Sequence, residues 1–223
     1  MPSKVEGNLP HTNEGYGTKI YWEERYSKEP PGTSFDWFLH PTYLLPLISD
    51  LIADLGHSAR ILMLGCGNSE LSAVMYDEGY RDIVNIDYSP TVIHQMSARH
   101  CERGTMKWVE MDALNLLFEE EFDLVIDKGT MDAMLTTKGD PWNPPEKDIQ
   151  ACTQEVSEAL RVLRKRSTSR FLYFTFGQPH FRRRYLADRP GWKLTHRSIG
   201  PPEGFEYFLY ILDWSLVSPE SRA

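Results

Sequence analysis

The chain has 223 residues, of which 41% are hydrophobic, and no break in composition divides it. A chain of this length can bury one sizeable core, so we expect a single domain over residues 1–223. Its formal net charge of −8 disfavours direct binding to a nucleic-acid backbone. The same charge either attracts a basic protein partner or only keeps the chain in solution.

The sequence also argues against a membrane span, a secretory signal and a metal site. It contains no run of about 18 apolar residues, and residues 1–6 lack the apolar stretch of a signal peptide. We therefore expect a cytoplasmic protein. Cys66, Cys101 and Cys152 are widely spaced and odd in number, which favours neither a disulfide framework nor a zinc site. The oligomeric state stays open.

The first 38 residues fall into two parts. Residues 1–15 are polar and rich in Gly, Pro and Asn, which predicts a mobile tail. Residues 16–38 concentrate aromatic side chains and are expected to form an N-terminal lid. The lid either only packs on the core or also lines a pocket for a cationic ligand, and the two uses are compatible. Its aromatic residues are Tyr16, Tyr21, Trp22, Tyr26, Phe35, Trp37 and Phe38.

A helix is predicted over residues 41–56, where Leu and Ile recur every three or four positions. The next stretch reads strand, turn, helix, strand. Residues 60–64 are an apolar run typical of a buried parallel strand, residues 71–78 have helical spacing, and residues 83–87 are a second strand that ends in an acid. Two parallel strands joined in this way form a right-handed βαβ unit.

A glycine turn and an acid mark the two strand ends of this unit. Gly65 and Gly67 leave no Cβ between a ligand and the backbone at the start of the helix. Asp87 follows Gly65 by 22 residues and is placed to accept hydrogen bonds from ribose hydroxyls. The unit is therefore either a nucleoside-binding half-site or a ligand-free βαβ unit whose glycines only make a tight turn.

The remaining elements complete the sheet. We predict helices over residues 90–100 and 149–163, strands over 106–111, 122–126 and 171–176, a turn over 177–181, and a hairpin that pairs 192–197 with 206–212. The expected fold class is α/β: a Rossmann-like, doubly wound seven-strand sheet, mostly parallel with an antiparallel C-terminal hairpin. A basic cluster over residues 161–170 suits either a helix C-terminus or a phosphate.

Polar residues follow the third and fourth predicted strands. Asp112 and Ala113 are placed to reach an adenine edge, although a solvated acid in a turn is the alternative. Asp127 and Lys128 end the fourth strand. Because ligands in open parallel sheets bind beyond the carboxyl ends of the strands, we expect these two residues beside the pocket. Asp132, in the same loop, is expected to contribute to substrate selectivity.

The pattern also discriminates between ligands. Glu70 stands where a dinucleotide site needs a third glycine, and no lysine follows Gly67 as a phosphate-binding Walker loop would require. S-adenosylmethionine has adenine and ribose without phosphate, and its sulfonium is cationic. The combination of glycine turn, ribose acid and aromatic lid therefore favours S-adenosylmethionine as cofactor.

These motifs resemble those of class I seven-strand methyltransferases. The resemblance lies in residues 21–26, 35–38, 64–69, 87–89 and 127–133, of which the last reads Asp-Lys-Gly-Thr-Met-Asp-Ala. More narrowly, the chain resembles the eukaryotic branch that methylates lysine on translation elongation factor 1-alpha, which is related to the domain fused to endothelin-converting enzyme 2. Members of that branch usually have Pro-Gly-Gly before the fifth strand, where this chain has residues 164–169.

The resemblance implies a role for each matched residue. Around the cofactor it implies Trp22, Tyr26 and Trp37 at the methionine part, Gly65 and Gly67 in the loop, Asp87 and Tyr88 at the ribose, Asp112 and Ala113 at the adenine, and Lys128 at the rim. Asp127 and Lys128 are the candidates for positioning residues in catalysis.

The resemblance further implies a protein-lysine N-methyltransferase with elongation factor 1-alpha as substrate. A small-molecule methyltransferase and a non-catalytic cofactor-binding scaffold remain alternatives. A lysine amine must be neutral to accept a methyl group, and an apolar channel favours that form. The expected channel wall is Trp37, Met131, Phe176 and Phe181, with His180 as a possible base.

Overall fold

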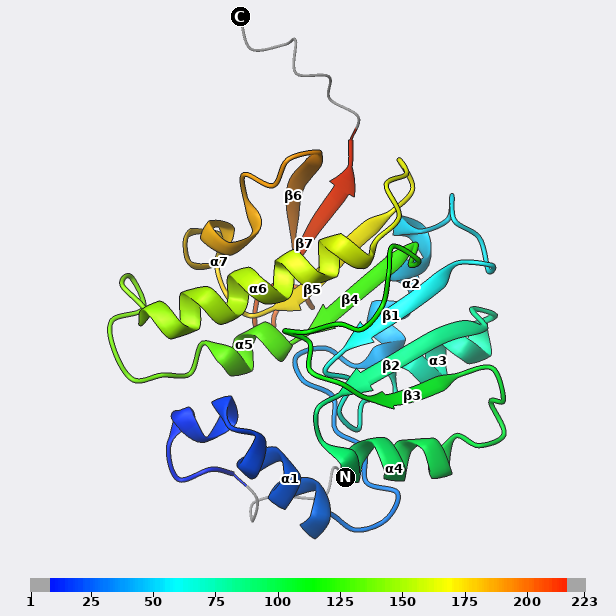
Figure 1. The fold of residues 1–223 in the computed structure, drawn as a ribbon, viewed down its shortest axis with the longest axis horizontal. Helices are drawn as coiled ribbons and strands as arrows, with labels where there is room; N and C mark the ends of the chain where they lie inside the picture. Colours follow the sequence, from blue (N-terminus) through cyan, green and yellow to red (C-terminus); the bar gives the residue numbers. More distant parts are fainter. Residues whose placement is uncertain (1–8, 216–223) are drawn as a thin grey trace, which may run out of the picture.

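Seven strands form one sheet in the order β3-β2-β1-β4-β5-β7-β6 in the computed structural model, which describes residues 9–215 (Figure 1). The strands β1 to β5 run parallel, β7 pairs antiparallel with β5, and β6 pairs antiparallel with β7. The predicted fold class and hairpin are thus confirmed. The strands are β1 (Arg60–Leu64), β2 (Asp82–Asp87), β3 (Lys107–Glu110), β4 (Leu124–Lys128), β5 (Arg170–Thr175), β6 (Trp192–Ile199) and β7 (Tyr207–Trp214).

Helices cover both faces of this sheet because successive strand side chains point to opposite sides. One face packs against α2 (Pro41–Leu51) and α3 (Leu71–Glu78), and the other against α5 (Thr130–Met134), α6 (Glu146–Val162) and α7 (Pro179–Leu186). The helix α4 (Pro90–Arg99) begins at Ser89, whose hydroxyl accepts a hydrogen bond from the Val92 amide.

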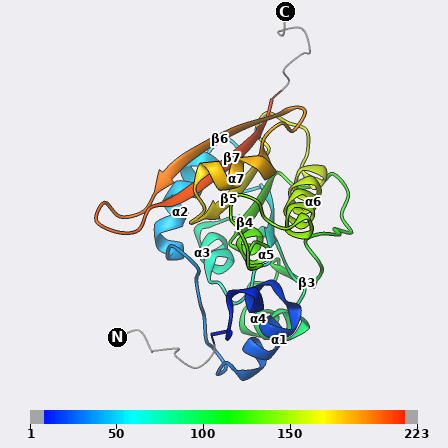
Figure 2. The ribbon, with the colours of Figure 1, turned by 90° about the vertical axis from the view of Figure 1, so that its left-hand side faces the viewer.

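The N-terminal lid packs on α4. It consists of the 3₁₀ helix η1 (Asn13–Gly17), the helix α1 (Lys19–Lys28) and an irregular segment that leads to α2. Figures 1 and 2 both show α1 beside α4, away from the hairpin. Trp22 and Tyr26 of α1 form a small hydrophobic cluster with Val92 and Met96 of α4. The helix α1 of the lid is therefore attached to the domain through the helix α4.

Several predicted elements need correction. Of the turn assigned to residues 177–181, residues 179–181 are the start of α7, and the sequence does not predict α1 and α5. The helix predicted over residues 41–56 is α2, which ends at Leu51. The strand predicted over residues 122–126 is β4, which runs over Leu124–Lys128. Of the expected tail, residues 1–8 lie outside the described part, and residues 13–15 belong to η1.

The basic cluster over residues 161–170 is engaged in ion pairs at the end of the sheet opposite the lid. Arg164 lies 2.6 Å from the Asp123 carboxylate, and Arg170 lies 2.7 Å from Asp54. These side chains are thus engaged with acids of the protein itself.

No helix within residues 9–215 is long and apolar enough to cross a bilayer.

Candidate functional site

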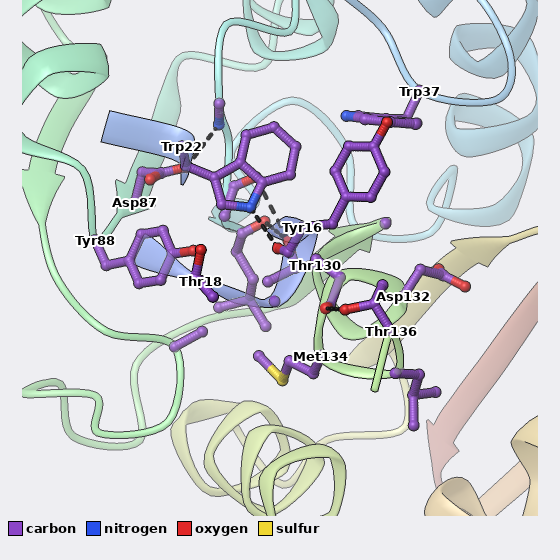
Figure 3. Close-up of a pocket in the computed structure, with 18 of the residues that line it drawn as sticks. Tyr16, Thr18, Trp22, Trp37, Asp87, Tyr88, Thr130, Asp132, Met134 and Thr136 are labelled. Carbon is purple, nitrogen blue, oxygen red and sulfur yellow. Dashed lines mark hydrogen bonds between the residues drawn. The ribbon is translucent and has the colours of Figure 1, made fainter. Parts of the chain in front are cut away.

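A cavity of about 1090 Å³ lies beyond the carboxyl ends of β1, β2 and β4, beneath the lid (Figure 3). In this sheet the strand order reverses between β1 and β4, which is where open α/β sheets bind ligands. The ten residues predicted to hold the cofactor all line this cavity. They are Trp22, Tyr26, Trp37, Gly65, Gly67, Asp87, Tyr88, Asp112, Ala113 and Lys128.

The turn after β1 brings its backbone directly to the cavity. Gly65 and Gly67 both have a φ of 50°, a conformation that favours glycine. A Cβ on Gly65 would lie 2.2 Å from the Thr130 hydroxyl, which donates a hydrogen bond to the Leu64 carbonyl at 3.0 Å. Because no side chain fits at Gly65, the turn is a cradle that a ligand can approach closely.

Asp87 holds the glycine turn in place from the end of β2. Its carboxylate accepts hydrogen bonds from the backbone N–H of Gly67 at 3.0 Å and of Ser89 at 2.9 Å. Burial raises the pKa of Asp87 to about 6. A carboxylate has about four acceptor positions, so Asp87 keeps capacity for ribose hydroxyls. This environment fits the predicted ribose contact.

The end of the cavity expected to hold the adenine is more open. Asp112 is exposed, and its carboxylate accepts the backbone N–H of Leu114 at 2.9 Å. Ala113 is buried beside it, and the half-buried Tyr88 ring follows Asp87. Small and apolar surfaces next to an acceptor suit the edge and face of a base, so these residues fit the expected adenine site.

The aromatic lid both packs on the core and lines the cavity. The rings of Trp22 and Tyr26 stack at 5.8 Å, and the Trp22 indole N–H donates to the Tyr16 carbonyl at 2.7 Å. In Figure 3 the Trp22 indole is seen between Asp87 and Tyr88 on one side and Tyr16 and Trp37 on the other. Aromatic faces attract cations, which suits the sulfonium of S-adenosylmethionine.

A buried polar contact joins the lid to the loop after β1. The Arg25 guanidinium lies 2.8 Å from the Glu29 carboxylate, and Glu29 accepts a hydrogen bond from the Asn68 side chain at 2.7 Å. All three residues are buried. Buried charges cost free energy unless they are paired and hydrogen-bonded, so this chain of contacts favours one closed position of the lid.

Lys128 makes a second connection between lid and sheet. Its ammonium lies 3.2 Å from the Asp36 carboxylate, and both side chains are largely buried. Burial lowers the pKa of Lys128, and the Asp36 charge opposes that shift. Asp36 also accepts a hydrogen bond from the Ser69 hydroxyl in the glycine turn. Lys128 thus lines the cavity, and its charge is used to hold the lid.

Asp127 lies behind the cavity wall instead of beside the pocket. Its carboxylate accepts the backbone N–H of Thr130 at 2.7 Å and of Met131 at 3.0 Å, so it caps α5. Neighbouring residues of a strand point to opposite faces, which places Lys128 toward the lid and Asp127 toward Glu155 on α6. Burial, followed by the charge of Asp132, raises the pKa of Asp127.

Two of the four residues expected in the channel wall do line the cavity. Trp37 and Phe176 lie at its edge, and Phe176 is 57% exposed. Met131 is fully buried in the core. Phe181 packs 4.9 Å from the exposed Trp142, which also stacks on His180 at 5.0 Å. The expected wall is therefore corrected at Met131 and Phe181.

Asp132 lines the cavity and also takes part in a buried network within the protein. Its carboxylate accepts hydrogen bonds from Arg182 at 2.7 Å, Thr175 at 2.6 Å and Tyr173 at 3.0 Å. These donors come from β5 and α7, so the network fixes α5 against both elements. The expectation that Asp132 reads the substrate stays a prediction, and three of its about four acceptor positions are occupied by donors of the protein itself.

Other cavity residues carry no motif that could have identified them. Arg182 is the buried partner of Asp132, fifty positions away in the chain. The lining also includes Tyr16, Thr18, Met134 and Thr136, which Figure 3 labels. Only Tyr16 was expected near the site, as part of the aromatic lid.

Comparisons with known proteins agree with this geometry. Residues 61–165 match the family profile of a methyltransferase domain. The chain is 36% identical over 213 residues to EEF1A lysine methyltransferase 4 of Bos taurus, which covers 95% of this chain and 81% of that protein. It is also 36% identical over 195 residues to eEF1A lysine and N-terminal methyltransferase of Homo sapiens, which covers 86% of this chain and 26% of that protein.

Solved structures share the fold at lower identity. A protein from a study of disulfide conversion into a thioacetal group during echinomycin biosynthesis has a TM-score of 0.61 at 20% identity, with 90% of this chain and 94% of that one covered. Magnesium protoporphyrin IX methyltransferase from Synechocystis, with bound S-adenosylmethionine, has a TM-score of 0.56 at 15% identity and the same coverage. The chain therefore belongs to the family of S-adenosylmethionine-dependent methyltransferases that includes EEF1A lysine methyltransferase 4.

Proposed function

We propose that this protein transfers a methyl group from S-adenosylmethionine to a lysine side chain of translation elongation factor 1-alpha. The observation that carries this proposal is the 36% identity to EEF1A lysine methyltransferase 4 across 95% of the chain. The identity thus extends well beyond residues 61–165, which match the methyltransferase profile and contain the glycine turn and Asp87. The cytoplasmic location expected from the sequence stays a prediction.

The proposed cofactor contacts follow from the lining of the cavity. When bound, S-adenosylmethionine supplies an electrophilic methyl group on its sulfonium. The glycine turn lets the cofactor lie close to the protein backbone, and Asp87 accepts hydrogen bonds from the ribose hydroxyls. Asp112 and Ala113 contact the adenine. Aromatic rings of the lid enclose the methionine part and keep water out. These rings belong to Trp22, Tyr26 and Trp37.

The reaction asks the protein chiefly to align a neutral amine with the methyl group. An apolar wall of Trp37 and Phe176 disfavours an ammonium ion, so it lowers the pKa of an incoming lysine from its usual value of about 10.4. We propose that Lys128 acts as a positioning residue through Asp36, and Asp127 through the start of α5. His180 stacks on Trp142 and is not assigned a role as base.

One experiment separates this function from the two alternatives. The protein is incubated with methyl-labelled S-adenosylmethionine and either purified elongation factor 1-alpha or a cell extract. We expect label on lysine of the elongation factor, located by mass spectrometry. Label confined to small molecules would support a metabolite methyltransferase, and no label in any fraction would support a non-catalytic scaffold. Methyl groups on arginine or nucleic acid would also contradict the proposal.

Charge is unevenly distributed along the chain, so the net charge of −8 does not describe every surface that a partner could contact. Residues 176–199 contain six Arg and Lys residues and one acid, so this part of the chain opposes the overall charge. Within it, Arg182 is neutralised by Asp132, while Arg183 and Arg184 of α7 are exposed. We propose that the most basic part of the partner does not dock over α7, because the exposed arginines there repel it.

Replacing Asp87 by alanine is expected to weaken S-adenosylmethionine binding by about 1–3 kcal/mol, because ribose hydroxyls lose their acceptor and the glycine turn loses two hydrogen bonds. Isothermal calorimetry measures the effect. Asp82→Ala, at the other end of β2, is the matched control and should bind like the wild type. Equal affinities of the Asp87 variant and the wild type would contradict the ribose assignment.

A further inference from the structure

We infer that Phe38 and Phe176 form the slot through which the acceptor side chain reaches the cofactor, and that Phe38 determines which side chains fit. The inference rests on the proposed function and deepens it. Both residues line the cavity, yet neither is assigned to the cofactor. They lie where the lid meets the ends of β4 and β5, on the far side of the site from the ribose and adenine residues.

Phe38 has an unusual backbone conformation. Its φ is 69°, in the left-handed region that bulky residues rarely adopt. Side chains of neighbouring residues in an extended chain point to opposite sides, but here the rings of Trp37 and Phe38 both line the cavity, 6.4 Å apart. The strained conformation therefore has a clear structural effect at the site: it adds a second ring to the same wall.

The surroundings of Phe38 fix its ring at the mouth. A Cβ on Gly129 would lie 3.2 Å from the Phe38 ring, so only glycine allows this close approach at the end of β4. On its other sides the Phe38 ring lies 5.7 Å from Phe176 and 5.7 Å from Tyr207. Phe176 is 57% exposed, which is high for a phenylalanine and places an aromatic face toward solvent at the entrance.

The chemistry of this slot suits an amine on a long, unbranched chain. Two aromatic rings give an apolar opening that accommodates methylene groups and excludes water from the amine. The charged side chains beside the slot are already paired: Arg182, 5.8 Å from the Phe176 ring, with Asp132, and Lys128 with Asp36. An apolar opening whose neighbouring charges are paired disfavours an ammonium ion, so the slot favours the neutral form that accepts a methyl group.

The decisive variant is Phe38→Gly, because glycine adopts a φ of 69° without strain. We expect its unfolding midpoint to fall only modestly, because relief of the strained φ offsets part of the packing that is lost with the ring. Turnover on elongation factor 1-alpha is expected to fall by about tenfold or more, because the amine is no longer aligned. Affinity for S-adenosylmethionine should stay within about threefold, because the cofactor contacts lie elsewhere.

Two further variants keep the test specific. Phe38→Tyr keeps an aromatic ring and is expected to recover most of the lost turnover. Asp188→Gly relieves the other non-glycine residue with positive φ among residues 9–215, at a φ of 57°, and should leave turnover unchanged. The inference that Phe38 forms the acceptor slot would be wrong if Phe38→Gly kept full turnover. It would also be wrong if the loss of turnover were matched by an equal loss of stability or of cofactor affinity.

The wild type tests the proposed function separately. If it does not methylate elongation factor 1-alpha, that function fails, and the same variants are compared on the acceptor that the labelling experiment identifies. A slot variant that behaves like wild type on a methylated acceptor overturns only the inference about Phe38. Absence of any labelled acceptor overturns both.

Discussion

Replacing Asp132 by alanine is expected to lower the free energy of unfolding by about 3–5 kcal/mol, because it leaves the Arg182 guanidinium buried without its counter-charge. The hydroxyl groups of Thr175 and Tyr173 lose their acceptor in the same step. Urea unfolding of the purified variant measures the change. A loss of less than about 1 kcal/mol, typical of surface changes, would contradict the buried ion pair.

The double variant Asp132→Ala/Arg182→Met separates the charge from the packing. Removing both partners eliminates the unpaired charge, so we expect it to recover a large part of the stability lost in Asp132→Ala. If the double variant is as unstable as the sum of both single variants, the pair contributes no coupling. Any loss of turnover in Asp132→Ala must then be corrected for the folded fraction before it is attributed to the acceptor.

The parallel sheet could be predicted because each strand can be recognised from a short stretch of the sequence. The residues of β1 and β5 are largely apolar runs, β2 is apolar except at Asn85 and its two ends, and glycines mark the turns that follow or precede these strands. The cofactor side followed for the same reason, since the glycine turn and Asp87 are fixed by positions within one βαβ unit. Each of the ten expected cofactor residues lines the cavity.

The acceptor side could not be predicted to the same degree, because its contacts join distant segments. The Asp132 network unites α5, β5 and α7, and nothing in residues 179–186 signals a helix whose middle is three arginines. Only Tyr185 and Leu186 are its large apolar residues in the core, too few for a visible helical period. Phe38 depends on a backbone angle that the sequence does not show.

The error at Asp127 has a different origin. Strand ends identify the edge of a sheet at which ligands bind, but not the face to which each side chain points. Asp127 shares a face with Val125 and therefore meets α6, whereas Lys128 reaches Asp36 on the lid side. A one-residue difference along β4 thus separates a side chain in the cavity from one in the core.

Asp127 in turn meets a second buried acid. Glu155 of α6 is fully buried, and its carboxyl group faces that of Asp127. Burial, followed by the charge of Asp127, raises the pKa of Glu155 well above its usual range. The folded protein therefore keeps a proton on Glu155 at pH values at which the unfolded chain has released it.

The direction of the pH effect follows from this raised pKa. The stabilising contribution is fully present below the unfolded pKa of about 4.3 and is lost as pH rises toward the folded pKa. Each proton held only by the folded state lowers the free energy of unfolding by about 1.4 kcal/mol per pH unit within that window. The raised pKa of Asp127 acts in the same direction.

Replacing Glu155 by glutamine is therefore expected to make the protein more stable at pH 7 and to flatten its pH dependence, since glutamine cannot ionise. The difference in slope should approach about 1.4 kcal/mol per pH unit between about pH 5 and 7. Denaturant unfolding at several pH values measures it. Glu146→Gln, an exposed change at the start of the same helix, is the control and should follow the wild-type curve. If the Glu155→Gln curve runs parallel to the wild type, Glu155 is ionised in the folded protein, and the neutral, buried carboxyl group behind the cavity is refuted.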